Sequence, residues 1–163
     1  MRLLLDEDVP VQFLEPLRRL LTGHVVDHTE GLGWKGKKDR YLLPDASKRG
    51  YEALLTNDSA QLASVEESRA IRDSGMHHIR YPQDTRRGLD GLALAIAAVT
   101  EAIRQVVCEL EEADGQRLIE IQAVQAGKRH RTIDPRVHPP PYWPTRAGNP
   151  RRTPRLPVPK SRS

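Results

Sequence analysis

The first eight residues constrain the fold most, because an apolar run there ends abruptly in charge. Three leucines lead directly into Asp6, Glu7 and Asp8. A short apolar run of this kind is typical of a buried strand that delivers polar groups to the edge of a sheet. Three neighbouring carboxylates repel one another, so a divalent cation, a basic partner or exposure to water must offset them.

Strand and helix patterns alternate along the chain. The strand patterns occupy residues 2–6, 24–29, 51–55, 77–81 and 118–124, and helical patterns lie between them, the longest at 88–113. Such alternation indicates right-handed crossovers between parallel strands. We therefore predict an α/β fold: a three-layer α/β/α sandwich with a mostly parallel central sheet. After the last strand, a hairpin through the basic run at 128–131 is expected to return to Ile133.

The end of the chain differs in composition from the rest. Residues 135–163 hold nine of the 13 prolines, seven of the 26 Lys and Arg, and none of the 22 Asp and Glu. Residues 1–134 therefore carry 19 basic and 22 acidic side chains, so the net charge of +4 comes from the tail. We predict one domain over 1–134 and a disordered Pro/Arg-rich tail over 135–163.

Cysteine content and hydropathy favour a soluble, cytoplasmic protein. Cys108 is the single cysteine, which excludes a disulfide framework within one chain and is typical of a reducing compartment. We expect it to be an inert core thiol. No run approaches the roughly 18 apolar residues of a membrane span, and Asp6 interrupts the apolar start that a signal peptide would need.

Four acids from distant positions are predicted at one edge of the sheet. In an open parallel sheet, ligands bind beyond the carboxyl ends of the strands. Asp6, Glu30 and Asp58 follow the first three strands. Asp39 opens a helix that runs back along the sheet, so it starts at the same edge. Oxygen ligands of this kind suit Mg²⁺, and such a site suits phosphodiester hydrolysis.

The same residues carry a resemblance to a known family. The stretch from Asp39 to Asp58 resembles the second half of PIN-domain nucleases, where an Asp opens a helix and a Thr-x-Asp motif ends the following strand. The opening Leu-Leu-Asp6-Glu7-Asp8-Val-Pro10, the Gly23-His-Val-Val strand and the Glu30-Gly-Leu-Gly33 loop look like the compact PIN-like branch. That branch includes VapC-like toxins of bacterial toxin–antitoxin pairs. The resemblance covers residues 1–82.

The resemblance implies a ribonuclease that depends on Mg²⁺ or Mn²⁺. Asp6, Asp39 and Asp58 match the metal-binding acids of the family, Glu30 matches its fourth acid, and Thr56 matches the hydroxyl residue before the last acid. RNA and a cognate antitoxin protein are the implied partners. The chain departs from the family after Asp58, where Ser-Ala-Gln-Leu replaces a segment that often holds another Asp followed by Phe. A proline inside the second helix, Pro44, is also unusual and is expected to kink or shorten it.

Each acid also has an ordinary interpretation. We expect Asp8 to cap the helix that begins at Pro10, and Glu7 to point to the opposite side of the pleat from Asp6. Asp39 by itself is also typical of a helix cap, and Asp58 of a turn. Joint placement at one edge is what caps and turns do not require. The scattered histidines lack metal-type spacing, and we assign them no ligand role.

A loop and a helix face suggest contacts with partners. Trp34 lies among Lys35, Lys37 and Lys38, a composition suited to stacking a base while lysines meet phosphates. The alternative is a solvated loop. The apolar stripe of the longest helix is expected to be core, or the face of a homodimer where it stays exposed.

Two other functions compete with the ribonuclease. The departure after Asp58 motivates a catalytically silent PIN-like module that binds RNA or protein. The less favoured alternative is a phospho-receiver signalling domain, with Asp58 as the acceptor. A receiver needs a hydroxyl residue after the fourth strand and a lysine after the fifth, but Tyr81-Pro82 and Gln125 stand there.

Overall fold

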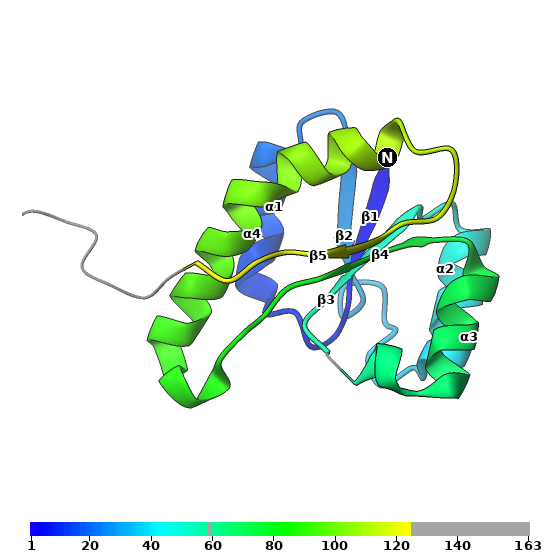
Figure 1. The fold of residues 1–163 in the computed structure, drawn as a ribbon, viewed down its shortest axis with the longest axis horizontal. Helices are drawn as coiled ribbons and strands as arrows, with labels where there is room; N and C mark the ends of the chain where they lie inside the picture. The colour runs from blue at the N-terminus through cyan, green and yellow to red at the C-terminus, as the bar shows by residue number, and fades with distance from the viewer. Residues whose placement is uncertain (59, 125–163) are drawn as a thin grey trace, which may run out of the picture. The chain divides into compact units, whose positions relative to one another are not determined.

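The computed structural model describes residues 1–58 and 60–124, which belong to one compact unit, Met1–Ala126. Its five strands form one all-parallel sheet in the order β2-β1-β3-β4-β5 (Figure 1). The strands are β1 (Arg2–Leu5), β2 (Val25–His28), β3 (Ala53–Thr56), β4 (His77–Arg80) and β5 (Leu118–Glu120). The predicted α/β fold is confirmed, although β3 is shifted to end at Thr56 and β5 ends at Glu120, well before the predicted residue 124.

Helices cover both faces of the sheet, as predicted for three layers. The helices are α1 (Leu14–Leu20), α2 (Asp39–Lys48), α3 (Val65–Ser74) and α4 (Gly88–Glu111), with short 3-10 turns at η1 (Val11–Phe13), η2 (Gln61–Ala63) and η3 (Thr85–Arg87). Figure 1 shows α1 and α4 on one side, and α2 and α3 on the other. Pro44 lies inside α2 without ending it. Pro44 and Arg40, the residue whose carbonyl Pro44 cannot pair with, are both exposed.

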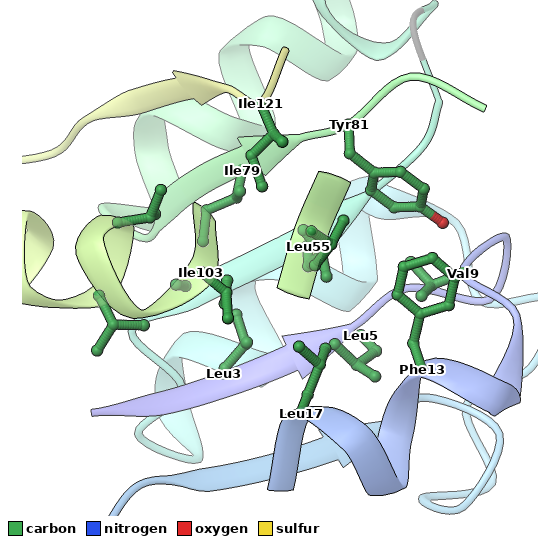
Figure 2. Close-up of a cluster of buried hydrophobic side chains, with 14 of the residues drawn as sticks. Leu3, Leu5, Val9, Phe13, Leu17, Leu55, Ile79, Tyr81, Ile103 and Ile121 are labelled. Carbon is green, nitrogen blue, oxygen red and sulfur yellow. The ribbon is translucent and has the colours of Figure 1, made fainter. Parts of the chain in front are cut away.

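The leucines of β1 divide between two cores, as the period of a strand requires. Leu3 and Leu5 pack against α1 and α4, in the cluster drawn in Figure 2. Leu4 points to the opposite face and packs with α2, α3 and Trp34. All three leucines are fully buried, and each contributes about 1.5–3 kcal/mol to folding.

Helix α4 confirms one prediction and corrects two. The predicted stripe is buried from Val99 to Leu110, so it is core. With η3 it forms a segment, Thr85–Glu111, that by length and composition alone could cross a membrane, contrary to our expectation of no such run. Its buried side nevertheless packs on the sheet. Cys108 is exposed, not core, because it lies on the side of α4 away from the sheet.

Some predictions lie outside the described residues. These are the hairpin to Ile133, the domain boundary at 134 and the disordered tail over 135–163.

Candidate active site

Asp6 lies at the carboxyl end of a central strand. It directly follows β1, its N–H donates to the Leu55 carbonyl at 3.0 Å, and only 5% of the residue is exposed. The chain runs from β1 to β2 on one side and later to β3 on the other. The sheet therefore reverses its winding beside Asp6, and open α/β sheets bind ligands at such a point.

A glutamine that the sequence patterns did not single out joins Asp6 to Asp39. The Gln61 amide nitrogen donates to Asp6 Oδ2 at 3.1 Å and to Asp39 Oδ2 at 2.9 Å. Gln61 Oε1 lies 3.0 Å from His78 Nε2. Gln61 is buried, with 3% of its surface exposed. Asp6 and Asp39 are thus brought together as predicted, through a residue in the segment that departs from the family.

Thr56 organises the other two acids. Its Oγ1 lies 3.2 Å from both carboxylate oxygens of Asp8, to which it donates, and accepts from the Asp58 N–H at 3.1 Å. The Asn57 N–H also approaches Asp8 Oδ1, at 3.4 Å. The Thr56 side chain therefore ties the loop after β1 to the loop after β3.

The predicted cap role of Asp8 is wrong. The first helical turn, η1, has Pro10 at its N-cap and no side-chain cap hydrogen bond. Asp8 is bonded instead to Thr56 and Asn57, which are far away in sequence. It is therefore a fourth acid at the edge, which local capping patterns did not reveal.

Glu7 is exposed to solvent, unlike its neighbour Asp6. Its carboxylate accepts from the Gly36 N–H and lines a cleft of about 400 Å³ together with Asp39. The cleft is completed by the following residues: Gly36, Lys37, Lys38, Arg40, Glu66 and Glu67.

The four acids lie close enough to perturb one another. Burial raises the pKa of Asp6. Burial, reinforced by the charge of Asp6, raises the pKa of Asp8 to about 6 and that of Asp39 to about 6. The charge of Asp58 raises both pKa values further. In the part of the chain that the structure describes, none of the four forms an ion pair with a basic side chain.

The donor set fits a magnesium ion without forming a complete cage. Within residues 1–58 and 60–124, no group of three or more acids, histidines or cysteines is placed to hold a metal ion. Asp6 and Asp39 nevertheless direct one oxygen each at a single point, which the Gln61 amide nitrogen occupies. Mg²⁺ binds through one or two carboxylates and keeps several waters. Asp6 and Asp39 therefore fit as ligands, with Asp58 close by.

Trp34 is not available to stack on a base. Only 8% of it is exposed, because it packs edge-on against Tyr51 in the smaller core. Lys37 and Arg49 cover its ring, at 4.8 and 4.5 Å from the centroid. The prediction of an open aromatic loop is therefore wrong: glycines and lysines made the segment look solvated, but its tryptophan is a core residue.

The predicted lysines separate into two groups. Lys37 and Lys38 line the cleft beside Asp39, and Lys37 also pairs with Asp45 at 2.5 Å. Lys35 lies elsewhere and pairs with Glu30 at 3.5 Å.

Glu30 is not brought to the other acids. It is exposed and lines a separate pocket with Val11 and Leu14. His28 in this region bonds to the Val9 carbonyl and the Glu30 N–H, so it has a structural role.

The chain was compared with family models, curated proteins and solved structures. No family model matches it, and neither does any curated protein or solved structure.

Proposed function

We propose that the protein is a metal-dependent ribonuclease of PIN-like type. The observation that carries the proposal is a set of four acids at the carboxyl ends of β1 and β3 and the start of α2, with no basic side chain paired to any of them among the described residues. Burying such charges is unfavourable unless a cation neutralises them. The resemblance of residues 1–82 to PIN-domain nucleases supports the same chemistry.

Asp6 and Asp39 would hold Mg²⁺ or Mn²⁺, with Asp58 contributing from the loop after β3. When bound, the metal supplies Lewis acidity toward a water and a phosphate oxygen. Thr56 is a positioning residue, because its hydroxyl holds Asp8 and the Asp58 backbone together. We assign no role to Glu30, since its carboxylate is paired with Lys35.

The cleft beside Asp39 carries basic side chains that could contact the RNA backbone, among acids. Lys37, Lys38 and Arg40 line it together with Glu7, Asp39, Glu66 and Glu67. Lys37 is paired with Asp45 and Arg40 with Glu66, so an RNA phosphate would meet Lys38 or replace one of these carboxylates, and salt would weaken the attraction. As a toxin of a toxin–antitoxin pair, the protein would act in the cytoplasm on RNA and would bind a cognate antitoxin.

The test is RNA cleavage by the purified full chain in Mg²⁺, with a chelator as the blank. Asp6→Asn and Asp58→Asn are expected to lose activity, while Glu52→Gln, at the start of β3, is the matched control and should cleave like the parent protein. Cleavage by both Asn variants at the parental rate would overturn the proposed site.

A silent binding module is the second candidate, because the Gln61 amide already satisfies the two converging carboxylates. Thermal unfolding in Mn²⁺ separates the two candidates, since a cation that binds the folded state raises its stability. RNA binding with neither cleavage nor Mn²⁺ stabilisation would favour the silent module.

A further inference from the structure

The orientation of the Gln61 side chain follows from its hydrogen-bond partners. Ionised Asp6 and Asp39 only accept hydrogen bonds, so the end of the amide that faces them must be the NH₂ group. Its carbonyl oxygen then faces His78, whose Nε2 must carry the proton. Burial lowers the pKa of His78 to about 4, so its ring is neutral at pH 7 and Nδ1 is its acceptor. This arrangement satisfies both ends of the Gln61 amide, while His78 Nδ1 is buried without a hydrogen-bond partner among the described residues.

The amide nitrogen occupies the position that a cation would take. It lies about 3 Å from one oxygen of each carboxylate, at 3.1 and 2.9 Å. A magnesium ion bound by the same two oxygens would sit about 2.1 Å from each. The cation and the Gln61 NH₂ group cannot occupy this position at the same time. Binding of the cation and the hydrogen bonds of Gln61 to the two carboxylates therefore exclude each other.

The segment that carries Gln61 has little apolar packing of its own, although the Ala60 N–H donates to Asp58 Oδ1 at 2.7 Å and the Ser68 hydroxyl donates to the Leu62 carbonyl at 3.3 Å. Gln61 is the buried residue of η2, while its neighbours Ala60, Leu62 and Ala63 are exposed. The side chain therefore anchors this turn through His78 and the two carboxylates. If it leaves them, little apolar packing is lost.

We propose that Gln61 is a built-in competitor of the divalent cation, holding Asp6 and Asp39 together in the metal-free protein and having to swing away before the cation binds. The inference rests on the metal site of the proposed function, but it does not require RNA to be the substrate. It explains how four acids that have no basic partner within residues 1–58 and 60–124 coexist without metal: a neutral donor bridges two of them. It also gives a role to the segment that departs from the PIN-like pattern.

The test measures Mn²⁺ binding to the full chain. The protein is first treated with a chelator to remove bound metal, and Mn²⁺ binding is then measured by isothermal titration calorimetry. Gln61→Leu removes the donating amide and keeps a similar volume, and Gln105→Leu, on the exposed side of α4, is the matched control. We expect the Kd for Mn²⁺ to fall at least about tenfold in Gln61→Leu, equivalent to about 1.4 kcal/mol, and to be unchanged in Gln105→Leu. The midpoint of unfolding without metal should fall in Gln61→Leu, because the two carboxylates lose their shared donor.

Gln61→Met keeps the length of the side chain and removes the donating amide without adding a carboxylate. This variant too is expected to bind Mn²⁺ more tightly than the parent chain. It tests the inference if Gln61→Leu does not fold. An unchanged or higher Kd in the folded variants, or no Mn²⁺ binding by them, would overturn the inference.

The outcome for this inference is distinct from the outcome for the ribonuclease. If the variants bind Mn²⁺ more tightly but no form of the protein cleaves RNA, the competitor role of Gln61 is supported and the ribonuclease proposal is overturned. RNA cleavage by the parent chain with no change in Mn²⁺ affinity in the variants keeps the nuclease and overturns the competitor.

Discussion

Asp27, in β2, and Asp6, just after the neighbouring β1, are carboxylates of the same sheet in opposite electrostatic surroundings. Asp27 accepts a hydrogen bond from the Tyr51 hydroxyl at 2.7 Å and pairs with Arg18 at 3.4 Å and Arg2 at 3.9 Å. Asp6 is more deeply buried, yet its partners are a neutral amide and a backbone N–H.

The same contrast extends to the two edges of the sheet. Where β3 begins and α4 ends, Glu52 and Glu111 pair with the N-terminal ammonium group of Met1, at 3.8 and 3.3 Å. Where β1 and β3 end, Asp6, Asp8 and Asp58 have no such partner among the described residues. The acids at the end of the sheet where β3 begins, and Asp27 in β2, are therefore paired with positively charged groups of the protein, as expected of acids with a structural role. Desolvated acids such as Asp6 and Asp8, close to an acid that lines a cleft, are typical of a functional site.

The largest expected effect is a difference in RNA cleavage between variants at the two ends of the strands. Asp39→Asn should lower Mg²⁺-dependent RNA cleavage by more than about 100-fold, because loss of a metal ligand exceeds the 10–100-fold effect of its outer partners. Glu111→Gln should cleave RNA normally. Rates of single-turnover cleavage at saturating Mg²⁺ measure both, and equal losses in the two variants would remove the distinction between the edges.

Next in size is a loss of stability at the paired acid. Asp27→Asn should destabilise the protein by about 2 kcal/mol, because Arg2 and Arg18 lose their shared anion. Glu15→Gln is the control: its exposed ion pair with Arg18 should be worth less than about 1 kcal/mol. Urea unfolding measures both, and a neutral Asp27→Asn would show that its ion pairs do not stabilise the fold.

The unpaired acids should make the metal-free protein less stable as the pH rises. Asp8 and Asp39 have pKa values of about 6 in the folded chain against 3.8 without perturbation. Between these values the folded state holds more protons than the unfolded state, so the stability they confer at low pH is lost as the pH rises through about 6. We expect a fall of about 1–2 kcal/mol after allowance for solvent screening.

Denaturant unfolding from pH 4 to 8 in a chelator measures this fall, and saturating Mn²⁺ should reduce it by favouring the ionised form. Stability that rises with pH over the same range in Asp27→Asn and in the parent chain alike would contradict the assignment.

The smallest effect is a gain. Asp8→Asn should stabilise the metal-free protein by about 1 kcal/mol at pH 7, or about 4 °C in the midpoint of unfolding, because it removes a repelled charge. The Asn oxygen can still accept from Thr56. The opposite sign in Asp27→Asn is the sharpest form of the comparison, and calorimetry of the two variants side by side measures it. Destabilisation by both would show that Asp8 is held by favourable charge interactions.

Regular elements were predictable wherever the periodicity was strong. The alternation of Leu3, Leu4 and Leu5 and the stripe from Val99 to Leu110 follow from the geometry of one strand or one helix. The burial of Trp34 was not predictable in this way. Glycine and lysine neighbours describe a loop locally, whereas the packing partner, Tyr51, lies in a different segment.

The sequence by itself determined the parallel α/β order and the approach of Asp6 to Asp39, because strand ends and helix starts meet at one edge whatever the details of packing. Only the tertiary structure decided what lies between them. The bridge from Gln61 to both carboxylates, and the bond from Thr56 to Asp8, join residues 22 to 55 positions apart. Contacts at such separations depend on how segments pack in three dimensions. That is why Asp8 reads as a cap in the sequence and lies among the acids in the fold.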